Sequence, residues 1–146
     1  MRMAVSRTRN GHCRVCYTTC VQNLLFYFFG LSLILLACFH TVAFAFSLYS
    51  IYLWFDVPMH ILGGITIALG YQSSYIFGQY AKRLPHTLLA TVIAVLIIGC
   101  GWELYEYIMG FMTGGLFSAT DTLTDIITNI IGGALGFIVA KAIRTL

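Results

Sequence analysis

The chain has 146 residues, of which 60% are hydrophobic and 9% are charged, and its mean hydropathy is +0.88. A water-soluble domain carries about 25% charged residues, so this composition excludes a soluble enzyme and predicts a protein embedded in a lipid bilayer. The net charge of +3 does not indicate nucleic-acid binding, because the basic residues lie only in the segments that flank apolar runs.

Apolar runs of about 20 residues predict bilayer-spanning helices. Four such runs follow one another, at about 24–47, 57–79, 87–109 and 122–142. We therefore predict an all-α, polytopic membrane protein. In this prediction residues 1–20 form a basic, cysteine-containing cytoplasmic arm, and residues 21–146 form one four-helix integral membrane domain.

The basic residues predict the orientation of the chain. They precede the first run, separate the second run from the third, and follow the fourth, whereas the other two connections contain no Lys or Arg. By the positive-inside rule, both termini and the connection between the second and third helices are expected in the cytoplasm. The chain is thus predicted to pass through the membrane several times. The residues concerned are Arg2, Arg7, Arg9, Arg14, Lys82, Arg83, Lys141 and Arg144.

The N-terminal part of the chain allows two alternatives of its own. His12, Cys13, Cys16 and Cys20 resemble a partial zinc motif, but no second pair of ligands completes it, so reduced thiols beside the membrane are the favoured interpretation. The first apolar run resembles a signal peptide, yet it is too long for one, and we expect it to be retained as an anchor. His40, within that run, is expected to be a hydrogen-bonded packing histidine.

Polar residues interrupt the other three runs at helical spacing. Asp121, Asp125 and Asn129 share one face of the last helix, because residues four apart lie above one another. Two further pairs, Asp56 with His60 and Glu103 with Glu106, lie near the corresponding ends of the other helices. Asp56 and Asp121 could instead cap their helices, as could Ser118 or Thr120. Small residues beside these polar faces are expected to let helices pack closely: Gly63, Gly64, Gly133 and Gly136.

The predicted topology brings all five acidic residues of the chain into one layer of the outer leaflet. His60 and Asp125 should lie about 6 Å below the outer ends of their helices, and Glu103 about 10 Å, from the rise of 1.5 Å per residue. No Lys or Arg occurs at 15–81 or 84–140. Because a charge in the membrane costs at least about 2.5–3.5 kcal/mol, these acids must hold protons, bind cations or face a water-filled cavity.

The candidate site follows from this layer. His60, Glu103, Glu106 and Asp125 are predicted to hold a divalent metal ion or a proton-transfer pair and to be the catalytic residues. Asp56, Asp121 and Asn129 are predicted to orient them or the substrate. A mixed carboxylate and imidazole set suits Zn²⁺, Mn²⁺, Fe²⁺ or Mg²⁺.

The pattern Asp56-x3-His60-x2-Gly-Gly, Glu103-x2-Glu106 and Asp121-x3-Asp125-x3-Asn129 resembles the VanZ-like and YjdF-like families of small polytopic membrane proteins. The resemblance covers about 56–136, and the Glu-x2-Glu form is closer to the YjdF-like proteins. It implies a bacterial inner-membrane protein of the cell envelope. One VanZ-like branch is associated with glycopeptide resistance. The resemblance supports the position of the site and implies no particular reaction.

Three functions remain open at this point. The first is a membrane enzyme or binding protein that acts on a lipid or lipid-linked substrate at the outer leaflet. The second is a component of proton- or cation-coupled transport, which would need to form a homo-oligomer because four helices are few for alternating access. The inner halves of the last three helices show no polar path across the membrane, which disfavours this second function. The third is an accessory protein whose acids only join helices.

Overall fold

The computed structural model describes residues 14–74, 84–113 and 118–145, and these residues contain helices and no β-strand. The all-α fold class is therefore confirmed. The helices are α1 (Arg14–Ala45), α2 (Leu48–Ile51), α3 (Asp56–Gln72), α4 (Leu88–Thr113) and α5 (Ala119–Arg144), with a 3-10 turn, η1 (Leu53–Phe55), between α2 and α3.

Three of the four predicted spans are long and apolar enough to cross a membrane: Cys20–Ala45, Leu88–Met112 and Ala119–Arg144. The helix α3 has 17 residues. Its length is about 26 Å at 1.5 Å per residue, somewhat less than the roughly 30 Å of a bilayer's hydrocarbon core. Its role as a fourth span stays a prediction.

Two helix boundaries differ from those predicted. The helix α1 begins at Arg14, ten residues before the predicted start at 24, so that the last part of the predicted arm is helical. The helix α3 ends at Gln72 instead of 79, and Ser73 forms its C-cap. His12 and Cys13 lie outside the described residues, as do 75–79 of the predicted second span.

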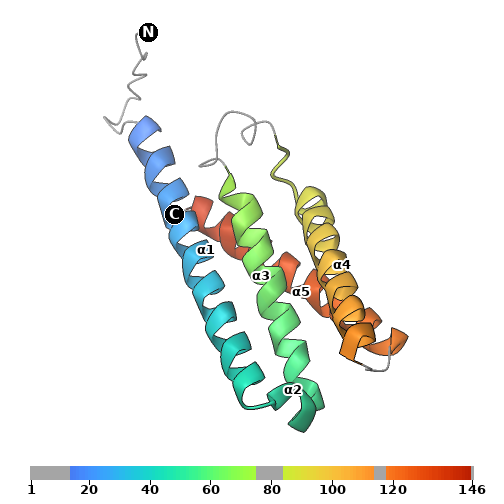
Figure 1. Ribbon diagram of the computed structural model, residues 1–146. Helices are drawn as coiled ribbons and strands as arrows, with labels where there is room; N and C mark the ends of the chain where they lie inside the picture. The colour runs from blue at the N-terminus through green and yellow to red at the C-terminus, as the bar shows by residue number, and fades with distance from the viewer. Residues whose placement is uncertain (1–13, 75–83, 114–117, 146) are drawn as a thin grey trace.

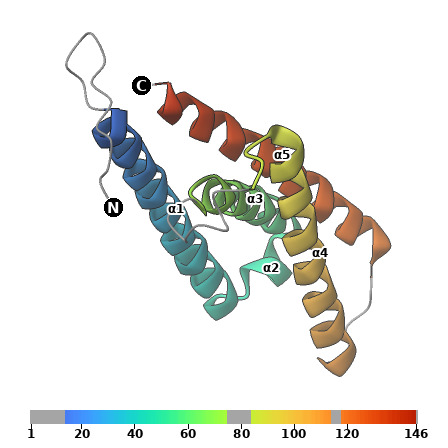
Figure 2. The same cartoon turned by 90° about the horizontal axis from the view of Figure 1, so that it is seen from above.

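The long helices pack around α3. Figure 1 shows α3 between α1 and α4, while α5 crosses behind it, and Figure 2 shows α1 and α4 on opposite sides of α3. Glycines allow the crossing of α3 and α5. A Cβ atom on Gly64 would overlap the backbone carbonyl of Asn129, and one on Gly132 would overlap that of Ile61. The two backbones therefore touch at this crossing.

The other predicted packing glycines contact different neighbours. A Cβ atom on Gly136 would lie 2.8 Å from Ala68 of α3, and one on Gly133 would lie 2.7 Å from Val95 of α4. At Gly63 the nearest atom would be the Asn129 side-chain oxygen, 3.5 Å away. Gly64, Gly133 and Gly136 therefore stand at close helix contacts, whereas Gly63 leaves room for a side chain.

The end of the bundle that is remote from α2 contains polar contacts that the sequence analysis did not predict. The buried Gln72 side chain donates a hydrogen bond of 2.7 Å to the hydroxyl of Thr91. The guanidinium of Arg144 donates one of 2.9 Å to the Gln72 carbonyl at the end of α3. Burial and the nearby Arg144 charge lower the pKa of His86, which precedes α4. This end of the bundle thus carries polar contacts at its helix ends.

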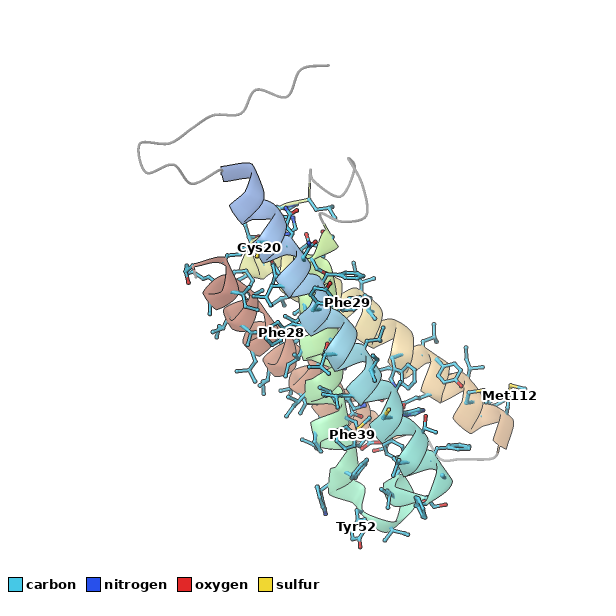
Figure 3. The ribbon with its side chains drawn as sticks, turned by 90° about the vertical axis from the view of Figure 1, so that its left-hand side faces the viewer. Cys20, Phe28, Phe29, Phe39, Tyr52 and Met112 are labelled. Atoms are coloured by element: carbon cyan, nitrogen blue, oxygen red, sulfur yellow. The ribbon has the colours of Figure 1, made fainter. Side chains whose placement is uncertain are left out.

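At the opposite end, Ser47 turns the chain between α1 and α2. Its backbone has φ 54° and ψ 34°, the left-handed conformation. The turn carries Tyr49 back towards α1, where its hydroxyl lies 2.9 Å from His40 Nδ1. His40 is thus a hydrogen-bonded histidine, as predicted. In Figure 3, Cys20 and Tyr52 mark the opposite ends of the molecule, with α1 in front of α3.

Candidate functional site

The imidazole of His60 lies at the centre of the polar residues, in the first two turns of α3, and it is 6% exposed. On one side of the ring, Nε2 is 3.4 Å from Asp56 Oδ1 and 3.7 Å from Asp125 Oδ1. Asp56 is the first residue of α3 and not its cap, since Phe55 is the N-cap and makes no side-chain capping bond. The carboxylate of Asp56 is thus available to the imidazole.

The other ring nitrogen, Nδ1, faces α4 and α5. It is 3.0 Å from the Asn129 amide nitrogen and 4.0 Å from Glu103 Oε1. Asn129 is 5% exposed. A Cβ atom on Gly99 would lie 3.2 Å from its amide nitrogen, so this glycine makes room for the amide. Asn129 therefore joins α5 to His60 and is held close to α4.

Glu103 contributes a buried carboxylate oxygen without a hydrogen bond. Its side chain is 9% exposed, and its Oε1 atom has no hydrogen-bond partner among the described residues. The side chain of Thr122 hydrogen-bonds the same carboxylate. A buried acceptor without a partner is costly, because the water that it lost is not replaced. The oxygen beside His60 is therefore suited to a cation or to a proton.

Glu106 lies beside aromatic residues that the sequence analysis did not place in the site. The indole of Trp102 donates a hydrogen bond of 2.7 Å to Glu106 Oε1. The Trp102 ring also lies 5.8 Å from the ring of His40. Burial, with smaller contributions from the Asp56 and Glu106 charges, raises the pKa of Tyr49 to about 12. The sequence analysis placed neither Tyr49 nor Trp102 in the site, and the spacing of four residues between Trp102 and Glu106 was the one signal for Trp102.

Asp121 is the predicted site residue that the structure leaves at the margin. It is exposed, in the first turn of α5, and its backbone N–H donates to the hydroxyl of Ser118, the N-cap, at 3.4 Å. Ser118 is therefore the cap, and Asp121 is not. The structure brings together the other six candidates, which we call the His60 cluster: Asp56, His60, Glu103, Glu106, Asp125 and Asn129.

Two overlapping groups in this cluster have donor atoms close enough to hold one metal ion. The first is Asp56, His60 and Asp125, and the second is His60, Glu103 and Glu106. In each group the donor atoms lie within 4.8 Å of one another. His60 belongs to both, so the two groups share one imidazole.

A cavity of about 460 Å³ reaches the cluster from the side of α1. It is lined by the facing sides of α1, α3 and α4 and by Asn129 of α5. Asp56, His60 and Glu106 lie at its polar end, and apolar residues such as Leu33 and Ile98 line its walls. Within the cluster, His60, Asp125 and Asn129 are buried, while Asp56 and Glu106 are accessible from the cavity.

Comparison with known proteins places the chain in a family of membrane proteins. No curated protein and no solved structure matches the chain. Residues 16–145 match the family described as "Predicted membrane protein (DUF2238)", which covers the whole His60 cluster. The description agrees with the apolar spans and names neither VanZ-like nor YjdF-like proteins, so that resemblance stays a prediction. The chain belongs to this family of predicted membrane proteins.

Proposed function

We propose that the His60 cluster binds one divalent metal ion and acts on the polar head of a lipid or lipid-linked substrate at the outer face of the inner membrane. The observation that carries the proposal is the arrangement around His60. Its Nε2 atom lies within 3.7 Å of two carboxylates, Asp56 and Asp125, while its Nδ1 atom is hydrogen-bonded to the Asn129 amide. Imidazole nitrogen and carboxylate oxygen are common ligands of Zn²⁺ and Mn²⁺.

Charge balance supports a cation at this position. The cluster contains four carboxylates, and the sequence supplies no Lys or Arg at 15–81 or 84–140. A protonated His60 would neutralise only one of these negative charges. A divalent ion would neutralise two, and so would lower the cost of placing acids in a membrane layer.

The second nitrogen of His60 fits the same interpretation. A histidine that binds metal through Nε2 carries its proton on Nδ1 and donates it to a neighbouring oxygen, which fixes the ring. The Asn129 amide is in that position, 3.0 Å away. With its amide turned so that the oxygen faces the ring, Asn129 would accept this proton. Asn129 is thus proposed as the residue that orients His60.

The chemistry expected of such a site is general acid–base catalysis beside a metal ion that acts as a Lewis acid. A bound divalent ion polarises an ester or phosphoryl oxygen, or activates water, near neutral pH. Glu103, with its buried and unpaired Oε1 atom, is the residue available to accept a proton there. A phosphate would have to be held through the metal, because no basic side chain is available in this layer.

The test measures metal content. The protein is purified in lipid nanodiscs, dialysed against Zn²⁺ or Mn²⁺ and analysed by mass spectrometry. About one equivalent is expected for the natural protein, and His60→Ala should bind at least about 10-fold more weakly, since it removes the shared ligand. Asp125→Asn should also weaken binding.

Asp121→Asn is the matched control, because Asp121 is exposed and belongs to neither metal group. It should bind metal as the natural protein does. The proposal is wrong if the natural protein binds no metal, or if His60→Ala and Asp121→Asn bind equally. Loss of the folded protein in His60→Ala and Asp125→Asn would instead favour acids that only join helices.

A further inference from the structure

The cavity beside the His60 cluster has the shape of a groove that runs along α3. Its lining extends from Asp56 to Tyr71 on α3 and from Phe29 to His40 on α1. At 1.5 Å per residue, these stretches are about 22 Å and 16 Å long. The volume of about 460 Å³ is within the range of small-molecule sites, about 300–1,000 Å³. An elongated ligand fits this outline better than a compact one.

The walls of the groove are apolar and reach the surface of the protein. Leu33 of α1 is 46% exposed and Ile98 of α4 is 54% exposed, and both line the groove. Both belong to helices that are apolar enough to span the bilayer. The groove therefore opens towards the hydrocarbon region, where lipid chains are the available occupants. Phe29, which lines the groove, is labelled in Figure 3 and lies between the two ends of α1.

The outer end of the groove is different, because it combines carboxylates with aromatic rings. Glu106 and Asp56 lie there with Trp102, Tyr49 and His40. The rings of His40 and Trp102, 5.8 Å apart, connect α1 to α4 across the groove. Aromatic faces beside carboxylates favour a protonated or quaternary amine, through cation–π attraction and direct charge pairing.

We infer that the groove binds a lipid whose head group carries an ammonium, with one hydrocarbon chain along α3 and the ammonium against the Glu106 carboxylate, beside the ring of Trp102. This inference names the substrate class of the proposed metal function and rests on it only in placing the head group at the His60 cluster. Glu106 is separate from the Asp56–His60–Asp125 group, so a metal ion and an ammonium can be bound at the same time.

The test uses the fluorescence of Trp102. The chain has two tryptophans, so Trp54→Phe leaves Trp102 as the only one. This variant is placed in phosphatidylglycerol vesicles, which contain no amine. Phosphatidylethanolamine with brominated chains, which quench tryptophan on contact, is then titrated against brominated phosphatidylglycerol. The ethanolamine lipid should reach half-maximal quenching at an about five-fold lower mole fraction.

Two controls separate the groove from the general lipid surface. Trp102→Phe leaves Trp54, which is 66% exposed, and both brominated lipids should quench it equally. Ala94→Phe fills the wall of the groove and should abolish saturable quenching of Trp102. Ala37→Phe, at an exposed position outside the groove lining, should leave it unchanged.

Glu106→Gln tests the charge itself. Its side-chain oxygen can still accept the Trp102 hydrogen bond, while the negative charge is removed. The ethanolamine preference should disappear. The inference is wrong if both lipids quench Trp102 equally in the Trp54→Phe variant that keeps Glu106. It is also wrong if Ala94→Phe and Ala37→Phe behave alike.

The same titration in EDTA separates this inference from the proposed metal function. If the metal analysis finds no bound metal and the ethanolamine preference is retained, the metal site is refuted and the groove inference stands. Metal binding without any head-group preference would refute the groove inference alone. A preference that disappears in EDTA would assign it to the metal and overturn the role of Glu106.

Discussion

At the scale of single residues, Asn129 links the parts of the site. It comes from α5, lies 3.0 Å from His60 of α3, and approaches α4 at Gly99. Its amide can donate or accept, and so it can match either tautomer of His60. It is therefore the residue through which helix packing fixes the orientation of the imidazole.

We predict that Asn129→Ala weakens metal binding at least about 10-fold, because the ring of His60 loses the partner that orients it. The affinity is measured by competition with a chromogenic chelator. Thr124→Ala is the matched control, since it shortens an exposed polar side chain on the same helix. Equal affinities of the two variants would show that Asn129 does not orient His60.

Much of the cluster could be predicted from sequence, for a physical reason. An acid or a histidine in an apolar run has few ways to be stable, so its presence alone marks a position of interest. Trp102 and Tyr49 could not be predicted in this way, because aromatic residues suit many positions in a membrane protein. Likewise, spacing did not distinguish a capping Asp121 from a ligand, whereas the bond from its N–H to Ser118 shows that Ser118 is the cap.

At the scale of helices, the crossing of α3 and α5 determines whether the cluster can form. Gly64 and Gly132 bring the two backbones into contact, which places Asp125 and Asn129 beside His60. At both glycines a Cβ atom would meet backbone atoms, which cannot move aside as a flexible side chain can.

Gly132→Ala should therefore destabilise the protein by about 1–3 kcal/mol, the usual cost of overpacking. It should also weaken metal binding, because the helices must separate. Thermal unfolding in detergent measures the first effect. Gly101→Ala is the control, since its Cβ atom would meet nothing within 4 Å, and the substitution should stabilise α4 by about 0.5–1 kcal/mol. If both variants unfold at the same temperature, the close crossing is wrong.

The helices were easier to predict than their ends. A run of apolar residues continues a helix wherever lipid surrounds it, but the end depends on partners far along the chain. The helix α3 ends where Gln72 meets Thr91 of α4 and Arg144 of α5, and no local pattern indicates those contacts. The same contacts place polar side chains in the half of the helices where the sequence analysis had found no polar path.

At the scale of the whole molecule, the two ends of the bundle differ in charge. The His60 cluster lies at the end that carries α2, while Lys141 and Arg144 lie in the last turn of α5, at the opposite end (Figure 1). Asp125 and Arg144 are separated by about 28 Å of helix. This separation agrees with the expected orientation, in which the cluster faces outwards and the basic end faces the cytoplasm.

We predict that Ser50→Cys, in α2, reacts with a membrane-impermeant maleimide in intact cells, whereas Thr145→Cys reacts only after permeabilisation. Both side chains are exposed. The variants are made in a chain whose five natural cysteines have been replaced. The opposite pattern would place the His60 cluster on the cytoplasmic side and would contradict the proposed outer-leaflet substrate.

The contact between His60 and Asn129 also has a consequence for biosynthesis. The two residues are 69 positions apart, so at 5–20 residues per second the ribosome needs about 3–14 s to add the second after the first. As the predicted fourth span, α3 would during that interval lie in the bilayer with Asp56 and His60 but without the helix that completes their surroundings. Assembly of the site therefore belongs to the stage after insertion, when complete helices associate. Until α5 has been made, the nascent protein would carry Asp56 and His60 without the partners that α5 supplies.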